Sequence, residues 1–173
     1  RRRPLRTLNQ RVPAIYKECV GFWTVQPRHE TRRSAHQLLC MPSFLRSIKT
    51  PIDALKVTQR CLLDHLFTQV AVTPFAHGFV PHRSIVTNAL IHSPSARSVL
   101  NLDLQDAFPS VAESRVKSLL RWRVASLLKT MTPQLTSEER VVLCDMITIL
   151  CTRDGALPQG APTSGYLLNL ACA

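Results

Sequence analysis

Two carboxylates follow a short apolar run near the middle of the chain. The run 99–102 leads into Asp103, and Asp106 comes three residues later. Such a run is typical of a buried strand, where a carboxylate is costly unless a cation compensates it. Because Mg²⁺ binds carboxylate oxygens and keeps positions open for substrate phosphates, we predict that Asp103 is a catalytic metal ligand. Alternatively, Asp103 pairs with a nearby arginine or caps a helix that begins near Pro109.

A second candidate site is the segment 157–164, which reads Leu-Pro-Gln-Gly-Ala-Pro-Thr-Ser. Its prolines and glycine predict an exposed loop, and Thr163 and Ser164 are expected to cap the helix that follows. A rigid loop at a helix N-terminus can also press on a base pair or a phosphate, which makes this loop a candidate binding site. The alternative is a purely structural entry into the helix.

The charge of the chain points to a polyanionic partner. Its 173 residues fit a single domain with a sizeable core, and 22 basic against 11 acidic side chains give a net charge of +11. Nucleic acid is the first partner that such an excess suggests, although a purely structural basic protein would share it. No apolar run approaches the length of a membrane span, so no membrane partner is expected.

The cysteines and the chain ends indicate the setting of the protein. Six cysteines are scattered without a close pair, which argues against zinc ribbons and disulfide-rich domains, and no signal peptide is recognisable. We therefore predict a reducing, cytoplasmic location. The chain starts with Arg1 and stops inside an expected helix, so we expect a piece of a longer protein.

Hydrophobic periodicity predicts the elements that carry these residues. A basic arm covers 1–13, and Thr136 with Glu139 has the spacing of a capping box. The expected strands are the end of 14–25, 46–51 and 99–104. The expected helices are 52–72, a segment that Ser84 caps, a strongly basic helix over 110–129, the helix after Thr136, and one that begins near Thr163.

Four motifs follow one another in the second and larger part of the chain. They are Arg46-x-Ile48-x-x-Pro51 with its following Leu55-Lys56 and Gln59-Arg60, the block 77–89, the segment 102–108, and the loop 157–164 with a Leu-x-Asn-Leu tail. In this order they resemble motifs of bacterial reverse transcriptases of the retron and group II intron type, and the wording of the second and fourth leans toward retrons.

The resemblance implies an α+β fold: right-hand polymerase fingers and a partial palm, with a small antiparallel sheet packed on helices. Residues 14–98 would form the fingers and the fingers/palm helices, and residues 99–173 would form a palm truncated before the family's Tyr-x-Asp-Asp motif. Without that carboxylate pair, we expect the chain alone to be inactive.

The same resemblance implies an RNA-directed DNA polymerase that adds dNTPs to a primer 3′ hydroxyl by two-metal phosphoryl transfer. Asp103 would bind two Mg²⁺ ions, and Leu104 would add its backbone carbonyl. The implied partners are dNTPs, a DNA or RNA primer, and an RNA template, which could be a cognate structured non-coding RNA. Antiviral defence is one role that such a protein could serve.

The remaining site residues are also carried over from the resemblance. Phe108 would exclude a 2′ hydroxyl, unless it is simply a core residue. The residues that would contact the dNTP are Arg46, Asp106, Ala107, Phe108, Gln159 and Gly160. The residues that would contact template or primer are Arg83, Ser84 and Asn88.

Two departures from the family pattern accompany the missing Tyr-x-Asp-Asp. The family's Pro-Lys hairpin before Arg46 has no clear counterpart, which leaves open which cation closes on the triphosphate. Gly165 stands where a proline is common. Two other kinds of protein fit the sequence: a non-catalytic RNA-binding relic of a polymerase, and a non-retron defence, RNA-templated RNA or template-independent polymerase on the same fold.

Overall fold

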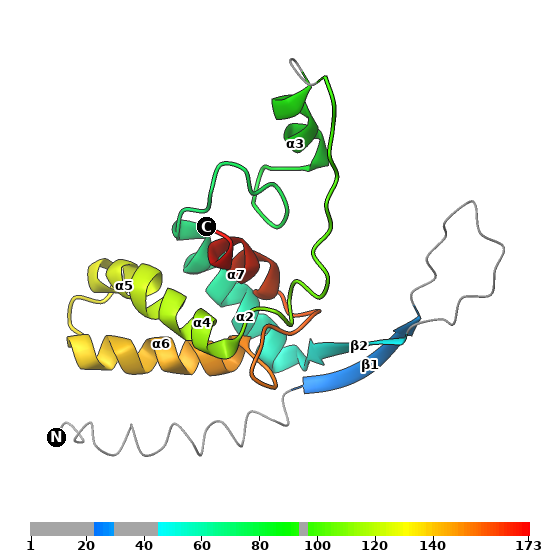
Figure 1. The fold of residues 1–173 in the computed structure, drawn as a ribbon. Helices are drawn as coiled ribbons and strands as arrows, with labels where there is room; N and C mark the ends of the chain where they lie inside the picture. Colours follow the sequence, from blue (N-terminus) through cyan, green and yellow to red (C-terminus); the bar gives the residue numbers. More distant parts are fainter. Residues whose placement is uncertain (1–22, 30–44, 94–96) are drawn as a thin grey trace.

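The computed structural model describes residues 23–29, 45–93 and 97–173. Most of them are helical, and the helices form one packed body with a two-stranded sheet on one side and a single helix projecting from it (Figure 1). In this part of the chain no helix has both the length and the apolar character needed to cross a bilayer. The predicted arm 1–13 lies outside the described residues.

The sheet is an antiparallel pair of β1 (Trp23–His29) and β2 (Leu45–Pro51), in register from Trp23 opposite Pro51 to His29 opposite Leu45. The predicted strand 46–51 is confirmed. The strand predicted at the end of 14–25 is observed from Trp23, but it is longer than predicted, because pairing with β2 continues to His29. Pro27 is tolerated within β1 because each strand of a two-stranded sheet is an edge strand.

Helix α2 (Asp53–His65) is shorter than the predicted helix 52–72 and is followed by the 3₁₀ turn η2 (Phe67–Gln69). Two side chains bond back to the last turn, because Thr68 Oγ1 donates to Asp64 O and Gln69 Nε2 donates to His65 O. These bonds satisfy carbonyls that a helix end leaves unpaired. The turn also buries Phe67 completely in the core.

The predicted basic helix 110–129 is observed as three consecutive segments: α4 (Glu113–Leu119), the π-helical turn η3 (Leu120–Val124) and α5 (Ala125–Met131). Leu119 is buried, and the other buried residues recur every four positions: Val116, Leu120, Val124 and Leu128. A row with that spacing drifts around a helix of 3.6 residues per turn. The wider π turn offsets the drift and keeps the row facing the core.

Helix α6 (Ser137–Cys151) runs beside these segments (Figure 1). Its predicted capping box is confirmed, since Thr136 N donates to Glu139 Oε2 at 2.8 Å and Glu139 N donates to Thr136 Oγ1 at 3.2 Å. Arg121 makes two hydrogen bonds to Asp145, and Lys117 forms an ion pair with the same carboxylate at 3.1 Å. These contacts fasten α4 and η3 to α6.

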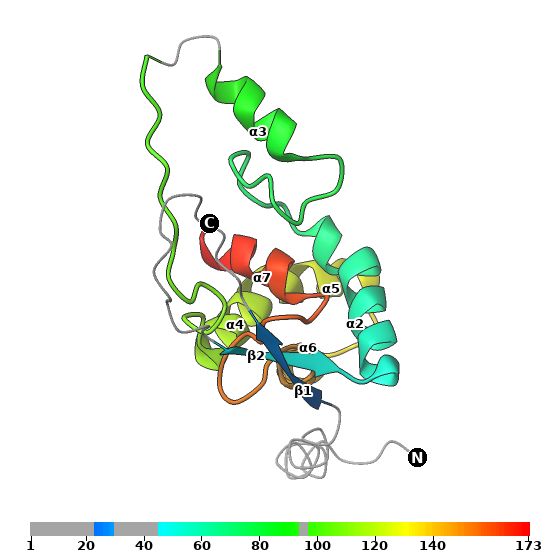
Figure 2. The same cartoon turned by 90° about the vertical axis from the view of Figure 1, so that its right-hand side faces the viewer.

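The last helix, α7 (Ser164–Ala171), starts at the predicted place and is largely buried. It packs on α4 and η2 (Figures 1 and 2). The Tyr166 hydroxyl donates to the carbonyl of Val70 at 3.0 Å. The predicted cap is only partly right: Thr163 occupies the N-cap position but its hydroxyl accepts no capping hydrogen bond, and Ser164 Oγ donates to Pro158 O instead.

Helix α3 (Ile85–His92) projects from the body and has no buried residue (Figure 2). The predicted cap is confirmed, because Ser84 Oγ accepts a hydrogen bond from Thr87 N. After α3 the chain returns to the body as an extended segment.

The predicted strand 99–104 is wrong, because this segment has no regular structure. Among the described residues it has no neighbouring strand, since the one sheet consists of β1 and β2. Its apolar side chains are exposed, including Leu102 at 80% and Leu104 at 71%. The expected palm sheet is therefore not observed, and the small antiparallel sheet comes from earlier in the chain.

Candidate functional site

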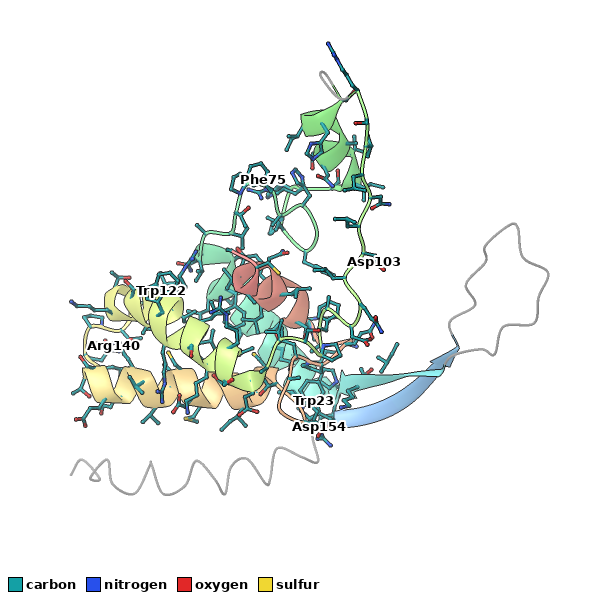
Figure 3. The ribbon with its side chains drawn as sticks, in the orientation of Figure 1. Trp23, Phe75, Asp103, Trp122, Arg140 and Asp154 are labelled. Carbon is teal, nitrogen blue, oxygen red and sulfur yellow. The ribbon has the colours of Figure 1, made fainter. Side chains whose placement is uncertain are left out.

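Asp103 lies in the extended segment between α3 and the body, with its side chain exposed (Figure 3). Within the described residues its carboxylate forms no hydrogen bond or ion pair. The alternatives of an arginine partner or a helix cap are therefore not observed. An exposed, unpaired carboxylate is free to accept a cation, and the adjacent Leu104 has no regular backbone structure that would occupy its carbonyl.

The turn after Asp103 holds the next predicted residues. Asp106 has a positive φ of 50°, and its carbonyl accepts hydrogen bonds from the backbone N and the Oγ of Ser110. This turn places Ala107 and Phe108 half-buried, with Phe108 against the edge of the main core. Phe108 is therefore partly a core residue, which was the alternative to its predicted role beside the sugar.

A short backbone pairing joins this turn to the loop with Gln159. Leu157 N donates to Val111 O at 3.0 Å, and Glu113 N donates to Gly155 O at 2.7 Å. Val111 lies three residues after Phe108, and Leu157 lies two residues before Gln159. The structure therefore links the two predicted site segments through their ends, although no hydrogen bond among the described residues connects Asp103 with Gln159.

Gly160 lies against β2. Its φ is +110°, and a Cβ added there would come within 2.9 Å of Ile48 Cγ2 and 3.4 Å of the Lys49 carbonyl oxygen. A side chain at this position would therefore need both an unusual backbone conformation and a shift of β2. The loop and the strand that contains Arg46 are thus held in direct contact.

An ion pair between Lys49 and Asp154 strengthens the same junction. The hydrogen bond from Lys49 holds the pKa of the Asp154 carboxyl below its ordinary value. Trp23, Leu55 and Ala161 form a small buried cluster that joins β1, α2 and the loop. The side chain of Arg46 lies outside the described part of the chain, so its contact with the triphosphate stays a prediction.

The turn at Gly78 and Phe79 docks onto α7. Asn169 Nδ2 donates to the Gly78 carbonyl at 2.7 Å, and the Phe79 ring occupies the space that a Cβ on Gly165 would fill, with a closest approach of 2.2 Å. The same ring meets Phe108 edge to face, with centroids 6.2 Å apart. Three of the four sequence motifs therefore meet at Phe79.

The predicted template residues have mainly structural contacts. Arg83 Nη1 donates to the carbonyls of Thr73, Pro74 and Ala76, which closes the loop before α3. Ser84 caps α3, as described above. Asn88 is exposed on α3, where its side chain is available to a ligand.

The described residues do not by themselves provide a magnesium centre. No group of three His, Cys, Asp or Glu side chains gathers in this part of the chain. Asp103 and the Leu104 carbonyl fall short of the octahedral donor set that Mg²⁺ requires. The remaining donors would have to come from the solvent, the substrate or residues outside the described ones.

Sequence reasoning missed the contacts of Phe79, Gly165 and Asn169. Phe79 and Asn169 stand within the quoted motifs, but their residue types carry no sign that they meet. Gly165 did stand out in the sequence, because a proline is common at this position. The Phe79 ring fills the space that a Cβ on residue 165 would need, which explains the glycine.

Known proteins with a similar sequence define the class. No family model matches the chain. Retron Mx162 reverse transcriptase from Myxococcus xanthus is 41% identical over 73% of this chain, and Retron Mx65 reverse transcriptase from the same organism is 40% identical over 72%. Retron Ec86 reverse transcriptase from Escherichia coli is 32% identical over 75% of it.

These matches identify the chain as a bacterial reverse transcriptase sequence. More narrowly, it belongs to the retron type of that family, as the motif wording suggested. The aligned part covers 27%, 36% and 30% of the Mx162, Ec86 and Mx65 relatives, so the chain spans about a third of their length.

Proposed function

We propose that the full-length protein is an RNA-directed DNA polymerase that extends a primer 3′ hydroxyl with dNTPs on an RNA template. The similarity to three retron reverse transcriptases over about three quarters of the chain carries this proposal. The exposed and unpaired Asp103, in the first palm motif, supports it from the structure. The fingers and palm assignment of 14–98 and 99–173 is part of the same proposal.

In this proposal Asp103 and the Leu104 carbonyl would help to hold two Mg²⁺ ions, whose chemistry is to activate the 3′ hydroxyl and stabilise charge on the triphosphate. The protein residues then have separate tasks. Backbone N–H groups of the turn at Asp106 and Ala107 would bind triphosphate oxygens, and Phe108 would lie beneath the sugar.

Gln159 and Gly160 would border the nascent base pair. The contact of Gly160 with β2 supports this role, because it holds the loop next to the strand that contains Arg46, the proposed triphosphate cation. A guanidinium suits a phosphate since the charge-assisted pair is both strong and directional.

For template contact we favour Asn88 over Arg83. Asn88 is exposed, whereas one Arg83 nitrogen is already used by three backbone carbonyls. Arg83 and Ser84 would act mainly by shaping the loop and the start of α3.

The proposal is tested with Asp103→Asn in the full-length protein. We expect the variant to fold normally but to lose nucleotide addition in a primer-extension assay with an RNA template, dNTPs and Mg²⁺. Asp64→Asn is the matched control, since Asp64 is an exposed carboxylate on α2 outside the motifs. Retained activity in Asp103→Asn would contradict the assignment.

One observation favours a second function, a non-catalytic RNA-binding relic: the described residues contain no three-ligand metal cluster. The same assay separates the two, because a relic would bind RNA without extending a primer in any variant. Comparing dNTPs with NTPs, with and without template, separates the proposed enzyme from related polymerases.

A further inference from the structure

An exposed row of side chains runs along α4, η3 and α5 on the side opposite the buried row. Its members, which we call the Trp122 face, are Arg115, Ser118, Trp122, Ser126 and Lys129. They are spaced three or four residues apart, so they lie on one side of the helix. With a rise of 1.5 Å per residue, the row is about 21 Å long.

Trp122 at the centre of this face has no role in the core. Its side chain is 71% exposed, whereas Leu120 and Val124 on either side of it are fully buried. A tryptophan is highly buried on average, so one left almost entirely in solvent calls for an explanation. Figure 3 shows Trp122 on a part of the molecule separate from Asp103.

The Trp122 indole contacts a neighbouring cation. The Arg123 guanidinium carbon lies 5.3 Å from the Trp122 ring centroid, within the range of a cation–π contact. Arg123 is in turn anchored, because its Nη2 donates to the Ala71 carbonyl at 2.6 Å. One surface of the ring is therefore supported by an anchored cation, and its exposure shows that much of the remainder faces solvent.

The charge around this indole is positive. Residues 113–131 contain five basic side chains and one acidic side chain, Glu113. Lys117 and Arg121 are paired with Asp145. The side chains of Arg115 and Lys129 form no hydrogen bond or ion pair with any described residue, so their charges remain available at the two ends of the face.

We propose that the Trp122 face binds a single-stranded nucleic-acid segment, at a place distinct from the proposed polymerase site. A base would stack on the Trp122 indole, and phosphates would contact Arg115 and Lys129. Single-stranded nucleic acid is recognised by this combination of an aromatic platform and flanking cations. A protein partner is disfavoured, because the face is basic and has only one large apolar group.

The test uses the full-length protein with its polymerase site filled by a saturating primer–template duplex and the next dNTP. Binding of a labelled oligo(U) or oligo(dT) of about 12 nucleotides, within the usual site size, is then followed by fluorescence anisotropy. The two probes distinguish an RNA from a DNA source for the bound segment.

We expect Trp122→Ala to weaken binding of the preferred probe about tenfold or more, and Trp122→Phe to restore most of it. Val57→Ala, which removes an exposed apolar side chain from α2, is the control and should leave binding unchanged. Neither tryptophan variant should alter thermal stability or primer extension on the duplex.

The cations have a separate signature. Arg115→Gln with Lys129→Gln should flatten the plot of log affinity against log salt by about 1.4, since each lost phosphate contact on a single strand removes about 0.7. Trp122→Ala should weaken binding without changing that slope.

Equal affinity of the wild type and Trp122→Ala would overturn the proposal, as would the absence of probe binding to the filled complex. Loss of a co-purifying protein in Trp122→Ala with unchanged probe affinity would also overturn it and assign the face to a protein. The polymerase proposal is tested separately by Asp103→Asn, so either proposal can fail while the other holds.

Discussion

The two segments proposed to form the polymerase site are supported very differently. The loop with Gln159 and Gly160 is fixed on several sides: by backbone pairing with residues 111–113, by contact with β2, and by the buried start of α7. The segment with Asp103 has none of these supports. Its apolar side chains are exposed, and the preceding helix α3 buries nothing.

This contrast shows that different parts of the protein position the two segments of the proposed site. The described helical body is sufficient to position the loop that would border a base pair. It is not sufficient to position the carboxylate. A carboxylate that must bind metal ions can be placed only together with its co-ligands, so its surroundings are expected to come from the same residues that supply those ligands.

The largest expected effect tests the contrast directly. In the 173-residue chain, Leu120→Ala should lower the free energy of unfolding by about 2–5 kcal/mol, because it empties a fully buried position. Leu102→Ala, at an 80% exposed position, should change it by less than about 0.5 kcal/mol. Urea denaturation measures both, and equal costs would refute the contrast. A cost for Leu102→Ala in the full-length protein alone would show that other residues cover this segment there.

An intermediate effect is expected at the contact between the loop and β2. Gly160→Ala should destabilise the protein by about 1–3 kcal/mol, since the backbone would be strained and the new Cβ would meet Ile48. The control is Gly155→Ala, which has a similar positive φ but open space around its Cβ, and it should cost less.

A double substitution then isolates the contact. Ile48→Ala should recover part of the loss in Gly160→Ala but none of the loss in Gly155→Ala, as a double-mutant cycle would show. If both glycine variants lost the same amount and neither was rescued, the contact with β2 would not be what fixes the loop.

The smallest effect concerns the ion pairs inside the body. Burial alone would raise the pKa of Asp145, but hydrogen bonds from Arg121 and Lys117 outweigh it and hold that pKa below its ordinary value. The stabilisation is therefore present above the unfolded pKa of about 3.9 and is lost as the pH falls through the lower folded value. Asp145→Asn should cost about 1 kcal/mol or less at pH 7, because both cations are partly exposed.

The measurement is the unfolding free energy of the wild type and Asp145→Asn between pH 7 and pH 3. The difference between them should shrink toward the acidic end of that range. A difference that grew with acidity would mean that the carboxylate is not stabilised in its charged form.

Local signals in the sequence were sufficient for several elements. The capping box at Thr136 and the cap at Ser84 each depend on residues three positions apart. Both helices begin as predicted. Strand β2 was found in the same way, from a short run before a proline. Each of these predictions needs only the chemistry of neighbouring residues.

The errors concern features that depend on distant residues. The run 99–104 has the composition of a strand, but a strand also needs a partner for its backbone. The π turn at Leu120 follows from how the helix faces α6. The three carbonyl partners of Arg83 could not be seen in the sequence either, although its predicted template contact stays a prediction. For the site, the sequence predicted which segments matter, while their contacts, such as Gly160 on β2, required the fold.

The packing of Phe79 on Gly165 has a consequence for how this protein family varies. A ring atom lies 2.2 Å from where a Cβ on residue 165 would stand, so even alanine cannot be added unless the Phe79 ring shifts. The two positions should therefore be inherited as a pair. Lineages that carry proline at position 165 should have a smaller or relocated aromatic side chain at position 79. Ancestral reconstruction should find the two changes on the same branches.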